Sequence, residues 1–197
     1  MELGAADYAA KPHNQESLRR RVLRVMSFHT LQERIRSQQD EACRDSMTGL
    51  LNRQGLYTIA ESLRHASFSA VYLFELDDLK KFNEKYGYVE GDHLIFHFAS
   101  LLRAHTRMDD VLVRLGGDEF LVVMCHMSSM EDVNKKKTAI LRAYHESRYA
   151  EPDLVACFAG TAFWNAEEPL DEIIRRAREV MYAAKAGGKD ECLIRKG

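Results

Sequence analysis

The sequence has 197 residues, of which 46% are hydrophobic and 29% charged, and its formal net charge is −2 at pH 7. This length and composition suit one globular domain with a hydrophobic core and an appendage. The near-neutral charge argues against nucleic-acid binding, and no apolar run approaches the ~20 residues of a membrane span. No signal peptide is visible, and the cysteines form no Cys-x-x-Cys pair, so we expect a cytoplasmic protein with reduced thiols.

Residues 1–30 look like the end of another domain. The string Gly-Ala-Ala-Asp-Tyr-Ala-Ala-Lys-Pro at 4–12 leads into an amphipathic stretch from Ser17 to Phe28. This segment resembles the last strand, Lys-Pro loop and final helix of a response-regulator receiver domain, in which the proline shapes the loop. A generic leader with a helix is the alternative.

Residues 31–44 are predicted to form a helical signalling linker. Between Leu18 and Ala42, apolar or neutral residues recur at roughly heptad steps that are broken once, as in a helix that dimerises. A solvated linker helix is equally consistent with the charged composition. Both interpretations place a linker before the compact domain.

The compact domain is predicted to occupy residues 45–197. Capping and turn residues from Asp45 precede a helix that runs to about His65. Further helices are expected over 79–86, 92–107, 130–148 and 170–186, and strands over 69–76, 154–163 and 191–195, with a hairpin over 111–125. This order predicts an α+β fold in which helices pack on the faces of a sheet.

Two acidic segments lie at the ends of predicted strands. Gly116 and Gly117 precede Asp118 and Glu119 at the tip of the hairpin, and residues 75–78 read Glu-Leu-Asp-Asp. Glycines allow the backbone to approach a phosphate closely, and acids at neighbouring strand ends can share divalent cations. Taken alone, however, such acids are usually solvated turn residues.

Five motifs in order give the segment from Asp45 to Arg195 a resemblance to GGDEF domains, the diguanylate cyclases of bacterial signalling. They are residues 45–53 (Asp-Ser-Met-Thr-Gly-Leu-Leu-Asn-Arg), 75–83 (Glu-Leu-Asp-Asp-Leu-Lys-Lys-Phe-Asn), 86–92 with Tyr-Gly-Tyr and Gly-Asp, 116–120 (Gly-Gly-Asp-Glu-Phe) and 184–189 (Ala-Lys-Ala-Gly-Gly-Lys). The resemblance implies a nucleotidyl-cyclase palm, a mostly antiparallel sheet flanked by helices. It also implies condensation of two GTP into cyclic di-GMP and two pyrophosphates by a homodimer, because one domain holds one GTP.

The same resemblance assigns roles to individual residues. The positions matching the family's catalytic residues are Asp118, Glu119 and Lys185. The positions matching its ligands for Mg²⁺ or Mn²⁺ are Glu75, Leu76 and Asp118. The positions matching its substrate-binding residues are Asn83 and Asp92 for the guanine, together with Gly116, Gly117, Leu79 and Lys189. Outside the resemblance, Asn83 and Asp92 would read as ordinary helix residues.

Three of these positions depart from the family pattern. Glu75 replaces the usual aspartate, Leu79 the usual aromatic residue, and Lys189 the usual arginine, which removes a bidentate fork. Mg²⁺ demands near-octahedral geometry at about 2.0–2.1 Å, so the extra methylene of Glu75 requires compensation. Two interpretations therefore stay open: an active cyclase, or a catalytically weakened module that binds GTP or cyclic di-GMP as a sensor or effector.

Arg107 and Asp110 form an Arg-x-x-Asp pattern, with five residues between Asp110 and Gly116. The resemblance matches this pattern to the family's inhibitory site for the product cyclic di-GMP. A guanidinium can fork to a guanine while a carboxylate accepts from its amine edge. The alternative is a surface salt bridge of little energetic worth.

Overall fold

The computed structural model describes residues 19, 22–23, 26–27, 38, 40–64, 69–127, 129–150, 155–164 and 168–186. The chain divides into two compact units, Met1–Ala42 and Cys43–Gly197, and each is described by itself. The described residues of the first unit have helical backbone; the receiver-like strand and loop expected at 4–12 lie outside the described residues. In the part of the chain covered here, no helix combines the length and the apolar character needed to cross a membrane.

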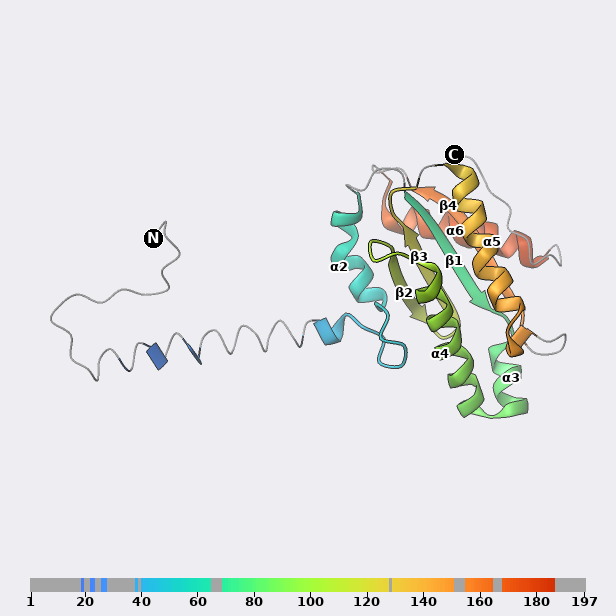
Figure 1. The fold of residues 1–197 in the computed structure, drawn as a ribbon, viewed down its shortest axis with the longest axis horizontal. Coiled ribbons are helices and arrows are strands. Elements are labelled where there is room, and N and C mark those ends of the chain that lie inside the picture. The colour runs from blue at the N-terminus through green and yellow to red at the C-terminus, as the bar shows by residue number, and fades with distance from the viewer. Residues whose placement is uncertain are drawn as a thin grey trace. The chain divides into compact units, whose positions relative to one another are not determined.

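The second unit contains a four-stranded sheet with helices packed against it (Figure 1). The strands are β1 (Ser69–Leu76), β2 (Val111–Gly116), β3 (Glu119–Met124) and β4 (Cys157–Trp164). The helices are α2 (Arg53–Arg64), α3 (Leu79–Tyr86), α4 (Tyr88–His105), α5 (Met130–His145) and α6 (Leu170–Ala186), with a 3₁₀ turn η1 (Arg148–Ala150). The predicted α+β class is confirmed.

The strands follow the order β2-β3-β1-β4, and each neighbouring pair is antiparallel. β1 lies between β3 and β4, and its side chains from Ser69 to Phe74 are all buried. This position explains why its sequence is an almost continuous apolar run, since helices cover both of its faces. The sheet is thus antiparallel, as the resemblance to the GGDEF family implies.

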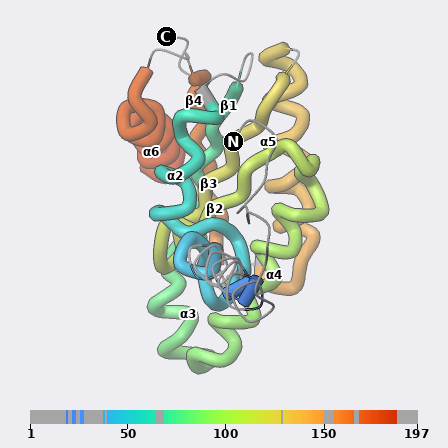
Figure 2. The backbone as a smooth tube through the Cα atoms, turned by 90° about the vertical axis from the view of Figure 1, so that its left-hand side faces the viewer, coloured from blue at the N-terminus to red at the C-terminus, as the bar shows by residue number. Residues whose placement is uncertain are grey.

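Alternate side chains of β1 belong to two separate hydrophobic clusters. Tyr72 and Phe74 pack with side chains of α4 and α5, whereas Val71 and Leu73 pack with those of α2 and α6. Figure 2 shows these two pairs of helices on opposite sides of the sheet. Because side chains alternate along a strand, Glu75 falls on the side of α2 and α6.

Several element boundaries differ from the sequence prediction. α4 begins at Tyr88 rather than at Asp92, because Gly87 at φ 89° lets the chain turn directly from α3 into α4. Asp92 therefore lies inside the helix and not at its first position. α5 ends at His145 rather than at 148, and β4 begins at Cys157 rather than at 154. The short strand expected at 191–195 lies outside the described residues.

Candidate functional site

The two acidic segments meet at one end of the sheet. Glu75 near the end of β1 stands opposite Glu119 at the start of β3. The Leu76 amide also donates a hydrogen bond to the carbonyl of Asp118 at 3.2 Å. Antiparallel pairing of β1 with β3 thus brings together the acids that the sequence predicts to converge.

Lys185 of α6 reaches over this end of the sheet. Its Nζ lies 2.7 Å from Oε1 of Glu75 and 2.6 Å from Oδ1 of Asp77, and it stands 5.7 Å from the centre of the Phe158 ring. Partial burial opposes the charged ammonium, but the hydrogen bonds to Asp77 and Glu75 outweigh burial and raise the pKa of Lys185. The lysine is therefore charged at neutral pH and neutralises part of the acidic cluster.

The Asp118 carboxyl is partly buried and lies near other acids of the site. Burial raises the pKa of its carboxyl, and the negative charges of Glu75 and Asp77 add to this effect. A backbone hydrogen bond and the charge of Lys185 act in the opposite direction. A carboxylate in this setting gains from a nearby cation.

The donor chemistry of this cluster fits a divalent cation. Glu75 and Asp118 supply carboxylate oxygens, which Mg²⁺ prefers. The repulsion from Glu75 and Asp77 that adds to the effect of burial on the pKa of Asp118 is what a cation would relieve. Within the described ranges, no three acidic, histidine or cysteine side chains surround one point, and Glu75 is in contact with Lys185. Leu76 is buried in the core, so only its main chain could contribute to a metal site.

Glu119 is held by a residue that the sequence analysis did not single out. Arg178 of α6 donates from Nε to Oε1 at 3.1 Å and from Nη2 to Oε2 at 3.0 Å, a two-point fork. Arg178 and Lys185 stand seven residues apart, which is two helical turns, so they share one face of α6. That spacing is the signal in the sequence that could have revealed Arg178.

The hairpin turn is fixed by a second arginine without a predicted role. Gly117 adopts φ 52°, a conformation that favours glycine, and its carbonyl accepts from Nε and Nη2 of Arg114 at 3.1 and 2.7 Å. Nη1 of Arg114 lies 3.2 Å from Oδ1 of Asp45. Gly116 and Gly117 remain exposed, so their backbone is open to a ligand while Arg114 holds the turn.

Asn83, at the junction of α3 and α4, has an amide oxygen that is left unpaired within the described part of the chain. Its Oδ1 is buried and has no hydrogen-bond partner among the described residues. A Cβ at Gly91 would lie only 1.8 Å from this oxygen, so the glycine provides the space for the amide. Asp92 follows Gly91 and is exposed. Because buried polar atoms are rarely left unpaired, the oxygen of Asn83 points to a ligand group at this position.

The two remaining residues with a predicted role in substrate binding are Leu79 and Lys189. The Leu79 side chain is 8% exposed and belongs to the core, so it can contribute only its main chain. It is the first residue of α3, where free backbone amides favour phosphate. Lys189 lies outside the described residues.

The predicted inhibitory pair is divided between the interior and the surface. The Asp110 side chain is 1% exposed and accepts from the backbone amides of Arg107 at 2.8 Å and Cys125 at 3.1 Å. Lys136 lies 3.5 Å away. Arg107 is exposed. Asp110 therefore fixes the turn before β2, and Arg107 is the member of the pair that is open to a ligand.

Comparisons with known proteins agree on one family. The family described as "Diguanylate cyclase, GGDEF domain" matches residues 42–191. The chain is 29% identical over 178 residues to the diguanylate cyclase DgcM of Escherichia coli, covering 87% of the chain and 43% of DgcM. It is 34% identical over 158 residues to the cyclic di-GMP phosphodiesterase PdeR of the same organism, covering 76% of the chain and 23% of PdeR. The chain thus spans less than half the length of either relative.

A solved structure has the same fold. The coiled coil and GGDEF domain of DgcB from Caulobacter crescentus, in complex with c-di-GMP, superposes with a TM-score of 0.76. The alignment covers 91% of this chain and all of that one at 20% sequence identity. At this identity the likeness concerns the fold.

Proposed function

The chain belongs to the diguanylate cyclase GGDEF-domain family, and we propose that it condenses two GTP molecules into cyclic di-GMP and two pyrophosphates. The observation that carries this proposal is the convergence of Glu75, Asp118 and Lys185 at one end of the sheet. Acids and a cation at one place suit phosphoryl transfer, in which positioning and charge neutralisation provide most of the catalysis.

The guanine of GTP is assigned to the junction of α3 and α4. Asn83 offers a buried amide oxygen that needs a donor, and Asp92 offers an exposed carboxylate beside it. The N1–H and exocyclic amine of guanine are donors of the kind that these oxygens require. Adenine has neither an N1–H nor an amine at C2, so in the same position it would not supply these two donors, which is how buried polar groups discriminate between bases.

The phosphates are assigned to the start of α3 and to the hairpin. The Leu79 amide lies at a helix N-terminus, which favours anions, and the exposed backbone of Gly116 and Gly117 allows close approach. Lys185 supplies a positive charge next to the acids, and Lys189 is assigned to the same phosphates from its match to the family motif. The substrate would then extend from Asn83 to the hairpin.

Mg²⁺ or Mn²⁺ is assigned to Glu75, Asp118 and the main chain of Leu76. When bound, such a cation neutralises charge on the phosphates and helps activate the attacking hydroxyl. Arg178 keeps the neighbouring Glu119 oriented through its two-point fork. Lys185 contacts Glu75 at 2.7 Å, so the lysine would have to turn toward the phosphates when the substrate binds.

Catalysis requires two copies of the domain, because each 3′-hydroxyl must attack the α-phosphate of the other nucleotide. We therefore propose a homodimer of half-sites, in which the encounter of the two GTP molecules sets the rate. We further propose that cyclic di-GMP inhibits the enzyme through Arg107. The exposed guanidinium supports this role, and Asp110 contributes by shaping the turn that carries it.

A second candidate function is a module that binds GTP or cyclic di-GMP without turnover. Two observations favour it: glutamate stands at position 75, and Lys185 occupies its carboxylate. One relative with this domain bears the name of a cyclic di-GMP phosphodiesterase. A protein of this second kind would keep Asn83 as a nucleotide-binding residue but would form no product.

The test is to incubate the purified protein at concentrations that give dimers with GTP and Mg²⁺ or Mn²⁺, and to measure cyclic di-GMP. We expect product from the wild type and none from Asp118→Asn, with Asp109→Asn, an exposed acid before β2, as the matched control. Tight GTP binding by a dimer that forms no product would establish the second function instead.

A further inference from the structure

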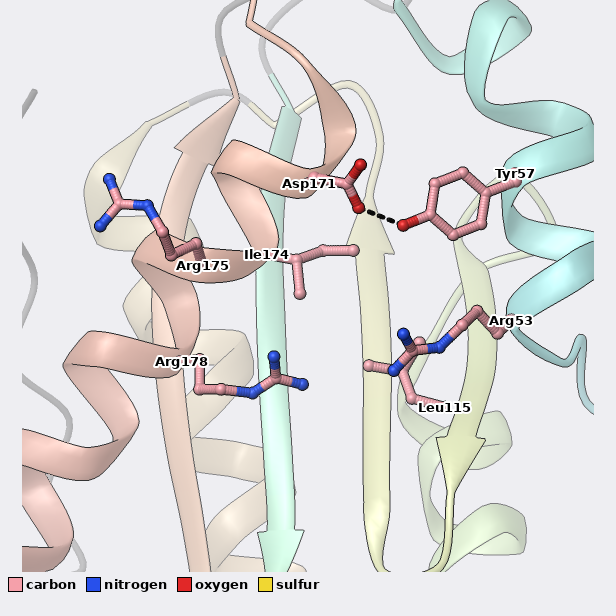
Figure 3. Close-up of a pocket in the computed structure, with 7 residues that line it drawn as sticks. All are labelled: Arg53, Tyr57, Leu115, Asp171, Ile174, Arg175 and Arg178. Carbon is pink, nitrogen blue, oxygen red and sulfur yellow. Dashed lines mark hydrogen bonds between the residues drawn. The ribbon is translucent and has the colours of Figure 1, made fainter.

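A hollow lies beside the hairpin, between α2 and α6. Its walls include Arg53 and Tyr57 from α2 and Asp171, Arg175 and Arg178 from α6, with Leu115 of β2 between them. Arg53 and Tyr57 are one helical turn apart, so both face the hollow. Figure 3 shows these residues in place. Leu115 directly precedes Gly116, so the hollow adjoins the catalytic hairpin.

Two guanidinium groups point toward each other across this hollow (Figure 3). Arg53 has no carboxylate partner within the described ranges. Arg178 uses Nε and Nη2 to hold Glu119, which leaves Nη1 without a hydrogen bond to any described residue. Like charges that face one another repel, and an anion between them would offset this repulsion. The arginine end of the hollow therefore suits a negatively charged ligand.

The other end of the hollow has the opposite character. The Tyr57 hydroxyl donates a hydrogen bond to Asp171, and this bond raises the pKa of the phenol. Arg175 points away from the hollow in Figure 3 and forms ion pairs with Glu172 and Glu179. The acid and its phenol thus close one end, and only the arginine end is left to attract an anion.

We propose that the arginine end of this hollow binds an oligophosphate, the chemistry shared by free pyrophosphate and the phosphate tail of a nucleotide. Guanidinium groups match phosphate oxygens with two-point hydrogen bonds and stay charged at any physiological pH. Arg178 would then join the bound anion to Glu119 of the hairpin. This site goes beyond the proposed function, which assigns no ligand to Arg53, Tyr57 or Asp171.

The experiment follows the side-chain Nε–H signals of Arg53 and Arg178 by NMR during titration with pyrophosphate in the absence of divalent cations. Arg53→Gln should weaken binding about tenfold, the effect of losing one charge-assisted contact. Asp171→Asn keeps an acceptor for Tyr57 and removes a negative charge, so it should tighten binding. Arg142→Gln is the matched control, because this exposed arginine pairs with Glu146 on α5, and it should change nothing.

A parallel titration with GTP, again without divalent cations, separates the two sources of the ligand. Shifts of both arginine signals with pyrophosphate identify a free oligophosphate, and shifts with GTP alone identify the tail of a nucleotide. Unmoved signals with both probes, or equal effects of Arg53→Gln and Arg142→Gln, overturn the proposal. Because the readout needs no product, a protein without cyclase activity can still bind here, and the two proposals fail separately.

Discussion

Substituting alanine for Gly91 tests whether the fold keeps Asn83 in place for a ligand. The added methyl would lie 1.8 Å from Oδ1 and 2.9 Å from Cγ of Asn83, so the amide must move. Alanine is otherwise favoured over glycine in a helix by ~1 kcal/mol, whereas overpacking typically costs about 1–3 kcal/mol. We expect Gly91→Ala to lower the free energy of unfolding by up to about 2 kcal/mol and to weaken GTP binding.

A double-mutant cycle isolates this contact. The three nearest atoms that the methyl would meet all belong to the amide group of Asn83, so Asn83→Ala removes them. In that background, Gly91→Ala should raise the free energy of unfolding by ~1 kcal/mol. Urea unfolding of the four proteins should give a coupling energy of about 1–3 kcal/mol. An equal effect of Gly91→Ala in both backgrounds would refute the reasoning.

Three further predictions concern charged residues. Asp118→Asn should abolish cyclisation yet raise the melting temperature at neutral pH. Burial raises the pKa of Asp118, so its contribution to stability falls as pH rises above the usual pKa of an aspartate; a melting-temperature difference that does not shrink toward acid pH contradicts this. Arg107→Ala should relieve product inhibition without loss of stability, and unchanged inhibition in this variant argues against the site. Asp110→Ala leaves two backbone amides without an acceptor and should lower the free energy of unfolding, measured in urea, by about 2–4 kcal/mol. Glu75→Asp should preserve or raise the rate of cyclic di-GMP formation, and a sharp fall would mean that the backbone has adapted to glutamate.

The sequence predicts the core of this fold because its strands and helices have clear patterns. β1 was recognisable from an unbroken apolar run, and it spans the expected residues, Ser69–Leu76. The sequence places acids at the end of this strand and at the tip of the hairpin, and the β1–β3 register brings Glu75 opposite Glu119. Because side chains alternate along a strand, Glu75 must lie on the face of β1 that α6 covers, once the positions of the helices are known.

Contacts between distant elements could not be predicted in the same way. The fork from Arg178 to Glu119 depends on how α6 lies across β3, which no local pattern specifies. The same holds for Asp110, which reads as a surface residue in an Arg-x-x-Asp string but is buried because the amide of Cys125 donates to it from the end of β3. The start of α4 at Tyr88 depends on Gly87, whose φ of 89° the sequence alone does not reveal.

Helix α6 carries a residue of the proposed anion site and contacts both acids at the end of the sheet. Lys185 and Arg178 hold Glu75 and Glu119, which are cross-strand neighbours, so each cation of the helix is matched to one acid of the sheet. Because both cations lie on one rigid helical face, a shift of α6 that frees Glu75 for a metal would also strain the fork on Glu119. An anion bound between Arg53 and Arg178 would act on the same face. Anion binding in the hollow and metal binding at the acid cluster should therefore be thermodynamically coupled. Each ligand should change the affinity for the other by the same factor.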